Sequence, residues 1–125
     1  MQVIRSTDLP GDQIARDFIG RDHGGLGFTF ILVDAGPGEG PKPHRHAYPE
    51  VLIVLEGVAD ATVDGKTVRV SVGDIVIVPT RAWHSFVNAG TGRLRQVDIH
   101  ASSHFITEWL EGPHPDPLPR AGEGY

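Results

Sequence analysis

The sequence predicts an all-β fold, either a sandwich or a barrel, in a single domain. Short segments rich in Val, Ile, Thr and Phe recur along the chain, and turn signals with Gly, Pro or Asp separate them about every eight to twelve residues. A chain of 125 residues is long enough for one barrel core and too short for two. The apolar content of 39% is ordinary for a globular protein, so the composition agrees with such a core.

The expected strands follow one another along the chain, each bounded by a turn. Residues 13–19 fit either a short strand or a short helix, and residues 28–33 form a strand with aromatic and β-branched enrichment. Six further strands are predicted over residues 51–55, 58–63, 67–72, 75–78, 84–87 and 94–99. Asp64-Gly65, between two of these segments, is a strong signal for a two-residue hairpin.

The last part of the domain predicts one short helix, over residues 103–111. One face of this helix would carry four apolar side chains: Phe105, Ile106, Trp109 and Leu110. Gly112-Pro113 would end it. Residues 113–125 contain four prolines and almost no apolar content, so we expect residues 1–112 to form the barrel and residues 113–125 to be a disordered tail.

Charge and cysteine content exclude several classes of partner and site. Sixteen acidic against eleven basic residues give a net charge of −5 without a cluster of Lys and Arg, so we expect neither nucleic acid nor a membrane as a partner. The longest aliphatic run, 51–55, is too short to span a bilayer, and residues 1–12 lack the apolar core of a signal peptide. The absence of cysteine excludes disulfides and thiolate metal sites, and it is compatible with the cytoplasmic location that we expect.

Three histidines and one glutamate stand at intervals that suit a metal ion. His44 and His46 are two residues apart on an extended segment, so their side chains share a face. Glu50 opens the next strand, and His84 begins a later strand from which it can converge on the same point. Imidazole and carboxylate accept several first-row divalent ions, so we expect one transition metal per chain, either Mn, Fe, Ni, Zn or Cu.

The residues around these side chains resemble the two sequence motifs of the cupin family. The first motif matches Gly38, five residues, His44-Arg45-His46, three residues, Glu50, six residues and Gly57. The second motif matches Gly73, five residues, Pro79, then His84, three residues and Asn88. The resemblance, to a small single-domain bacterial cupin of the cupin 2 type, implies a double-stranded β-helix (jelly-roll) barrel. It also implies that His44, His46, Glu50 and His84 are the metal ligands.

One position departs from the family pattern. Arg81 stands two residues after Pro79, where the family usually has glycine. If this site requires a positive φ, an arginine there costs roughly 1–2 kcal/mol. Arg81 lining the mouth of the pocket is an alternative reading, and Asn88 resembles a family position whose side chain ties a loop together.

The resemblance implies a metal-dependent enzyme that acts on a small oxygen-rich molecule. Dioxygenase-like chemistry is favoured within the family, and isomerase, lyase or decarboxylase reactions remain compatible with the ligands. The alternative is a non-catalytic module that binds or senses a small ligand. Gln96, Asp98 and His100 share strand parity and are the candidate catalytic groups, although a polar strand edge near the expected helix is the favoured explanation.

We also expect a homodimer. Residues 51–55 are apolar at both parities of the strand, which predicts that both faces of this strand are covered. An isolated barrel needs cover on one face only, and similar small cupins commonly dimerise.

Overall fold

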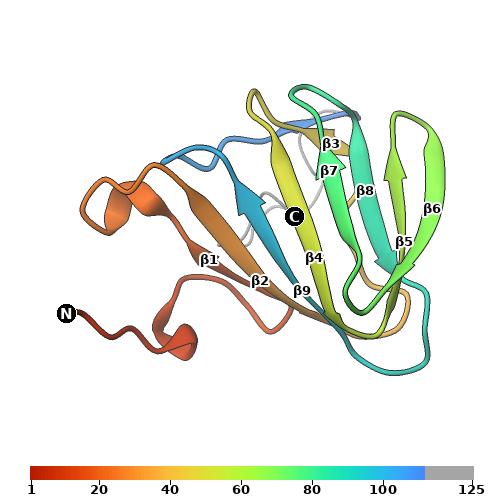
Figure 1. The fold of residues 1–125 in the computed structure, drawn as a ribbon, viewed down its shortest axis with the longest axis horizontal. Coiled ribbons are helices and arrows are strands. Elements are labelled where there is room, and N and C mark those ends of the chain that lie inside the picture. The colour runs from red at the N-terminus through yellow and green to blue at the C-terminus, as the bar shows by residue number, and fades with distance from the viewer. Residues whose placement is uncertain (112–125) are drawn as a thin grey trace.

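The structure, a computed structural model, describes residues 1–111 and is built from two antiparallel sheets that share one core (Figure 1). Two short 3-10 turns, η1 (Ser6–Asp8) and η2 (Gly20–Asp22), flank the first strand. The strands are β1 (Ala15–Phe18), β2 (Thr29–Ala35), β3 (His44–Arg45), β4 (Glu50–Glu56), β5 (Val58–Val63), β6 (Lys66–Ser71), β7 (Ile75–Val78), β8 (His84–Asn88), β9 (Leu94–His100) and β10 (Glu108–Trp109). No helix in residues 1–111 is long and apolar enough to cross a membrane.

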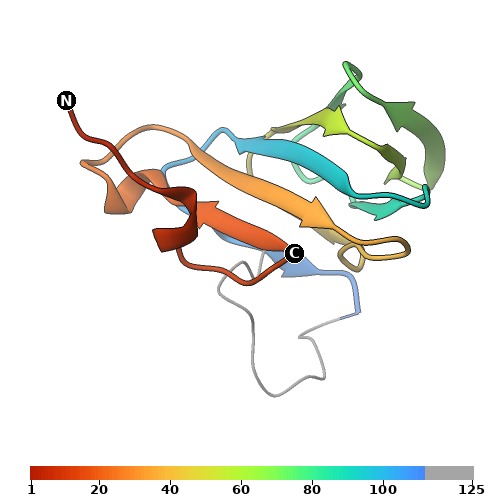
Figure 2. The same cartoon turned by 90° about the horizontal axis from the view of Figure 1, so that it is seen from below.

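Neither sheet is formed by one continuous segment of the chain, because the strands of the two sheets are mixed in sequence order. Sheet A has the strand order β1-β2-β9-β4-β7, and sheet B has the order β10-β3-β8-β5-β6. Seen in two directions, β1 and β2 lie at the end of the molecule near the N-terminus, and the β5–β6 hairpin lies at the opposite end (Figures 1 and 2). This arrangement confirms the predicted all-β double-stranded β-helix.

Most of the predicted strands are confirmed. The predictions over 58–63 and 75–78 coincide with β5 and β7, and the other predicted strands differ by one or two residues at one or both ends. Of the two alternatives for residues 13–19, the strand is observed, as β1. Asp64 and Gly65 have φ values of 48° and 82° and join β5 to β6 in the predicted two-residue hairpin.

The inner face of sheet A changes from apolar to polar along the strands. Strand β9 buries Leu94, Gln96, Asp98 and His100 in alternation. Leu94 pairs with Ala35 at the apolar end, whereas His100 pairs with Glu50 at the polar end. The barrel therefore keeps an apolar core at one end and a buried polar group at the other.

The predicted helix over residues 103–111 is wrong. The segment forms β10, which pairs with β3 through Glu108 opposite Arg45, and the Leu110 N–H donates to the Pro43 carbonyl at 3.1 Å. A short helix is marginal without extensive packing, whereas β3 would otherwise present an unpaired strand edge. The predicted tail, 113–125, lies outside the described residues, so the domain boundary stays a prediction.

Candidate metal centre

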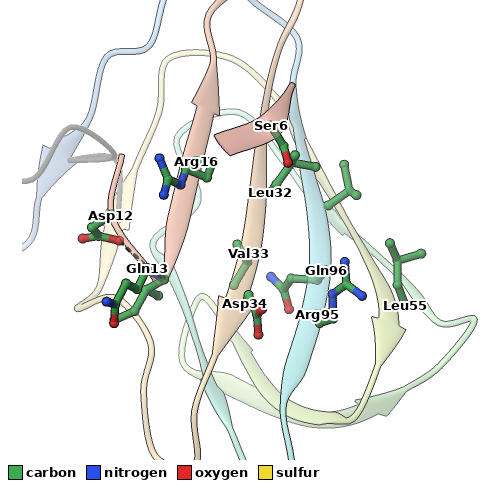
Figure 3. Close-up of a pocket in the computed structure, with 12 residues that line it drawn as sticks. Ser6, Asp12, Gln13, Arg16, Leu32, Val33, Asp34, Leu55, Arg95 and Gln96 are labelled. Atoms are coloured by element: carbon green, nitrogen blue, oxygen red, sulfur yellow. Dashed lines mark hydrogen bonds between the residues drawn. The ribbon is translucent and has the colours of Figure 1, made fainter. Parts of the chain in front are cut away.

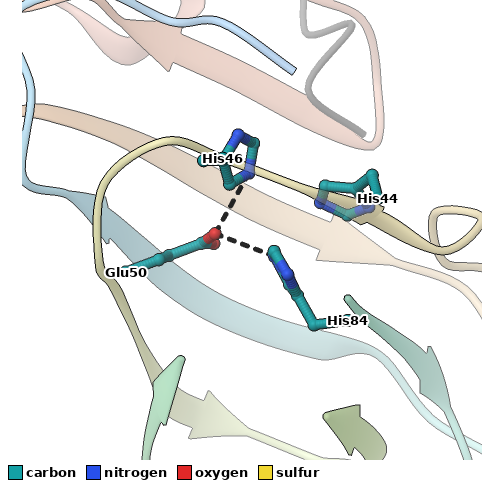
Figure 4. A group of neighbouring side chains, drawn as sticks. All are labelled: His44, His46, Glu50 and His84. Carbon is teal, nitrogen blue, oxygen red and sulfur yellow. Dashed lines mark hydrogen bonds and ion pairs between the residues drawn. The ribbon is translucent and has the colours of Figure 1, made fainter. Parts of the chain in front are cut away.

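The four candidate ligands come from both sheets and meet inside the barrel (Figure 4). His44 on β3 and His84 on β8 are directly paired across sheet B, and Glu50 opens β4 in sheet A. His46 lies just beyond β3, where the Arg81 N–H donates to its carbonyl at 2.9 Å. One ligand atom from each of the four side chains lies within 4.8 Å of the others, and all four residues are buried. The structure therefore brings together the whole predicted ligand set.

Backbone carbonyls orient the three imidazoles. Each ring donates Nδ1–H to one carbonyl: His44 to Lys42 at 2.7 Å, His46 to Ile106 at 2.8 Å and His84 to Ala82 at 2.9 Å. Because a carbonyl oxygen only accepts, the proton of a neutral ring sits on Nδ1 and the lone pair on Nε2. The three Nε2 atoms are thus the ones available to a metal, a pattern that is usual for metal-binding histidines.

The Glu50 carboxylate completes the donor set. Its Oε1 lies 3.2 Å from His46 Nε2 and 3.0 Å from His84 Nε2. Within the described residues, the buried Nε2 of His46 has no hydrogen-bond partner. Nitrogen lone pairs packed against a carboxylate oxygen require a cation between them, so the group fits one divalent transition-metal ion.

The ionisation states agree with this reading. Burial and the neighbouring His84 lower the pKa of His44 to about 3, which leaves the ring neutral and ready to ligate at neutral pH. Burial would raise the pKa of Glu50, but the neighbouring imidazoles of His100, His46 and His84 hold it well below its usual range. Although burial lowers the pKa of His84, its hydrogen bond to Glu50 more than compensates, and the pKa is raised.

The three candidate catalytic residues on β9 all face the interior. Gln96, Asp98 and His100 are at most 2% exposed, which excludes an exposed polar strand edge. Gln96 donates its side-chain amide to Asp98 Oδ1 at 2.7 Å, and His100 Nε2 lies 3.3 Å from Glu50 Oε2. Burial lowers the pKa of His100, so this ring is neutral. His100 directly contacts the candidate ligand Glu50, and a catalytic role for any of the three stays a prediction.

Two contributions to the site were not resolved by sequence reasoning. The hydroxyl of Tyr48 lies 2.8 Å from His100 Nδ1, a contact that the sequence spacing does not indicate. The Ile106 carbonyl, which accepts from His46, lies in the segment that was predicted as a helix. No side-chain pattern identifies a backbone acceptor, because every residue carries one.

A separate cavity of about 220 Å³ lies on the outer face of sheet A (Figure 3). Its wall includes Leu32, Asp34, Arg95 and Val97, which alternate along β2 and β9 with the inward-facing residues. Since the candidate ligands lie on the inner side of the barrel, this cavity is distinct from the metal site.

A two-sheet jelly-roll barrel with three histidines and a glutamate converging inside it defines a class of metal-binding β-barrel proteins. The chain belongs to the cupin family, because the family described as Cupin domain matches residues 31–100, a range that includes all four candidate ligands. The resemblance of the two motifs is thereby confirmed.

Curated relatives include enzymes with different reactions. Gentisate 1,2 dioxygenase 1 of Aquipseudomonas alcaligenes is 43% identical over 80 residues, which cover 61% of this chain and 23% of that protein. Dimethylsulfoniopropionate lyase DddW of Ruegeria pomeroyi is 36% identical over 74 residues, which cover 59% of this chain and 48% of the lyase. The chain thus spans from about a quarter to about a half of the length of these relatives.

Solved structures show the same fold. A mutant of Bacillus subtilis oxalate decarboxylase superposes with a TM-score of 0.75 at 20% identity, over 86% of this chain and 31% of that one. A second structure of the same enzyme, from work on its Mn(II) centres, has a TM-score of 0.73 at 23% identity, over 83% of this chain and 30% of that one. Metal-binding cupins are therefore among the neighbours of this barrel.

Proposed function

We propose that this protein is a metal-dependent enzyme that acts on a small oxygen-rich molecule carrying a carboxylate. The observation that supports it is the convergence of three Nε2 lone pairs and one carboxylate oxygen within 4.8 Å. Four protein donors on an ion that accepts six leave two positions for water or substrate, which is typical of a catalytic rather than a closed structural site.

The residues of the chain prepare this site in three ways. The carbonyls of Lys42, Ala82 and Ile106 orient the imidazoles, the low pKa of Glu50 keeps its carboxylate charged, and burial keeps bulk water away from the ligands. A metal ion held there would polarise a carboxylate or carbonyl of the bound molecule and lower the pKa of a bound water. Gln96 and Asp98 are our candidates for contacts to the substrate.

The names of the relatives favour a substrate that carries a carboxylate. Gentisate, oxalate and dimethylsulfoniopropionate all carry a carboxylate, a group that binds first-row metal ions and can chelate with a neighbouring oxygen. Dioxygenase-like chemistry is favoured because a dioxygenase is the relative with 43% identity. The fold alone does not select the reaction, so the substrate must be found by experiment.

The first test is the metal content of the full-length protein, measured by elemental mass spectrometry beside a His46→Ala variant. We expect close to one equivalent of a transition metal in the parent protein and a large loss in the variant. A parent protein that takes up no metal, even after reconstitution with Mn(II) or Fe(II), would contradict the proposal.

The second test is turnover. The protein loaded with Fe(II) or Mn(II) is incubated with gentisate, oxalate or dimethylsulfoniopropionate, and oxygen uptake and products are followed. Turnover that the His46→Ala variant lacks supports an enzyme. A carboxylate that raises the melting temperature of the loaded protein without being converted favours the alternative, a module that binds or senses its ligand.

We further propose that the protein acts as a homodimer in the cytoplasm. The outward-facing side of sheet A carries a continuous apolar surface, defined here as the sheet A patch: Val51, Ile53, Ile75, Ile77 and Ile99. Ile77 is 71% exposed and Ile75 is 62% exposed, which is unfavourable unless a second surface covers them. The absence of cysteine supports the location only weakly.

A further inference from the structure

His100 is bonded differently from the three candidate metal ligands. Those three rings direct Nδ1 at a backbone carbonyl, which can only accept a hydrogen bond, and His46 Nδ1 also lies 3.3 Å from the Tyr48 hydroxyl. His100 Nδ1 instead lies 2.8 Å from the hydroxyl of Tyr48, a group that can donate. The partner of one ring nitrogen decides which nitrogen of a neutral imidazole carries the proton, so this difference separates His100 from the ligands.

The other ring nitrogen of His100 indicates the direction of the bonds. His100 Nε2 lies 3.3 Å from Glu50 Oε2, whereas His46 and His84 approach Oε1. A lone pair on Nε2 would repel the carboxylate, and an N–H is attracted to it. The proton therefore belongs on Nε2, and Nδ1 is left to accept from the Tyr48 hydroxyl.

The reverse arrangement is less favourable. If His100 Nδ1 donated to Tyr48, the Tyr48 hydroxyl would have to donate elsewhere, and the Ile106 carbonyl lies 3.5 Å away. That carbonyl already accepts from His46 Nδ1 at 2.8 Å. A hydrogen bond of 3.5 Å to a carbonyl that already accepts another is weaker than one of 2.8 Å to His100 Nδ1.

Strand register holds the two side chains together. Glu50 and His100 are directly opposite each other on β4 and β9, in the middle of sheet A, and both are at most 1% exposed. A one-residue slip would turn either side chain to the outer face, so the contact depends on the fold and not on flexible side chains.

We propose that His100 is a positioning residue for Glu50: its Nε2–H lies 3.3 Å from Oε2 and attracts it electrostatically, so that Glu50 meets the metal through Oε1 alone. The Tyr48 hydroxyl selects the His100 tautomer that makes this possible. The inference rests on the proposed metal site and explains why a fourth buried histidine next to the ligands is not itself a ligand. Ligation through one oxygen also keeps a position on a six-coordinate ion open for the substrate.

The test is a titration of the metal-free, full-length protein with Mn(II), followed by electron paramagnetic resonance (EPR). We expect His100→Leu to raise the Kd for Mn(II) about 10- to 100-fold and to change the EPR fine structure. His100→Gln should recover most of the affinity, because its amide N–H can donate to Glu50 Oε2. Tyr48→Phe should raise the Kd by roughly three- to tenfold, since it leaves His100 in place but removes the donor to Nδ1.

Different results separate the possible failures. A parent-like Kd and EPR spectrum in His100→Leu would overturn the proposal. It would also be overturned if both His100 variants lost Mn(II) binding as completely as His46→Ala, because His100 would then be a ligand. If circular dichroism shows that His100→Leu does not fold, the Kd of Tyr48→Phe decides, and an unchanged value overturns the proposal. A parent protein that binds no metal would overturn the proposed function, and this inference with it.

Discussion

Arg81 has a left-handed backbone conformation, with φ of 67°, in the turn that leads to His84. The sequence raised this possibility, because the cupin motif usually has glycine at this position. The Arg81 side chain is exposed, and the backbone N–H of Arg81 donates to the His46 carbonyl. Since L-residues other than glycine disfavour this conformation, the turn that holds two candidate ligands is strained.

Replacing Arg81 with glycine should stabilise the protein. Removal of the left-handed strain is worth roughly 1–2 kcal/mol, and the greater flexibility of glycine in the unfolded chain offsets roughly 0.5–1 kcal/mol of it. We expect the free energy of unfolding of metal-free Arg81→Gly to rise by about 0.5–1 kcal/mol in urea. The matched control, Arg81→Ala, removes the guanidinium but keeps the strain, and it should leave stability nearly unchanged. Equal stability of the two variants would show that the turn is not strained.

The neutral, buried His44 makes the metal-free protein sensitive to acid. Its pKa is about 3 in the folded chain and 6.5 in the unfolded chain, so only the unfolded state takes up this proton between those values. Stability must therefore fall as the pH drops below about 6.5. The pKa of His84 is raised, so its protonation affects the free energy of unfolding with the opposite sign. This stabilising contribution is already complete below pH 6.5, and it does not change as the pH falls further.

Urea denaturation of the metal-free protein at several pH values tests this effect. From pH 6.5 to pH 5, we expect the free energy of unfolding to fall by about 2 kcal/mol through His44, at 1.36 kcal/mol per pH unit. His44→Gln cannot titrate and should show a flatter dependence. An equally steep dependence in the variant would contradict the assignment to His44.

At the level of single elements, β10 matters more than its two residues suggest. It covers the edge of β3, and the preceding Ile106 carbonyl orients His46. At the opposite end of sheet B, Asp64 in the β5–β6 hairpin accepts from the Trp83 N–H through its side chain, at 3.1 Å, and donates its own N–H to the Trp83 carbonyl. Two elements distant in sequence thus hold the backbone on either side of the candidate ligands.

The role of β10 can be tested at Leu110, whose side chain is 51% exposed. Leu110→Pro removes the N–H that donates to Pro43 and should lower the free energy of unfolding by about 1 kcal/mol. Because the same segment orients His46, we expect the Kd for Mn(II) to rise roughly tenfold. Leu110→Ala keeps the N–H and should behave like the parent protein. A parent-like Kd in Leu110→Pro would separate β10 from the metal site.

For the whole molecule, the main question is what covers the sheet A patch. Its side chains alternate with the buried ones, so the same strands that carry Glu50 inward present isoleucines outward. Burial of such a surface against a second copy is favourable by about 25 cal/mol for each Å² removed from water. A symmetric dimer would place the two barrels back to back, with their sheet A patches in contact.

Size-exclusion chromatography with light scattering tests the dimer at micromolar concentration. We expect a dimer for the parent protein and a monomer for Ile77→Lys, because a lysine cannot be buried unpaired in an apolar interface. Val87→Lys is the matched control, since Val87 is an exposed apolar residue on β8 in the other sheet. A monomeric parent protein, or a dimer lost equally in both variants, would exclude this interface.

The strands and the candidate ligand set were predictable because their signals are local. Alternation with a period of two marks residues 67–72, most of which form β6, and Asp64-Gly65 marks a hairpin whatever surrounds it. The expected role of Asn88 in tying a loop together is also observed: its side chain donates to the Ala35 and Gly92 carbonyls and accepts from the Gly90 N–H. The helix over 103–111 failed because its apolar spacing could not reveal the open edge of β3.

By itself, the sequence determined the chemistry of the candidate centre: which side chains carry imidazole or carboxylate, and which of them share a strand face. Only the tertiary structure decided that β9 lies beside β4, that His100 therefore stands opposite Glu50, and that a carbonyl from β10's segment orients His46. The physical reason is the distance along the chain over which each of these features is decided. Side-chain direction follows from the local pleat of a strand, whereas the neighbour across a sheet is chosen by the burial of the whole core.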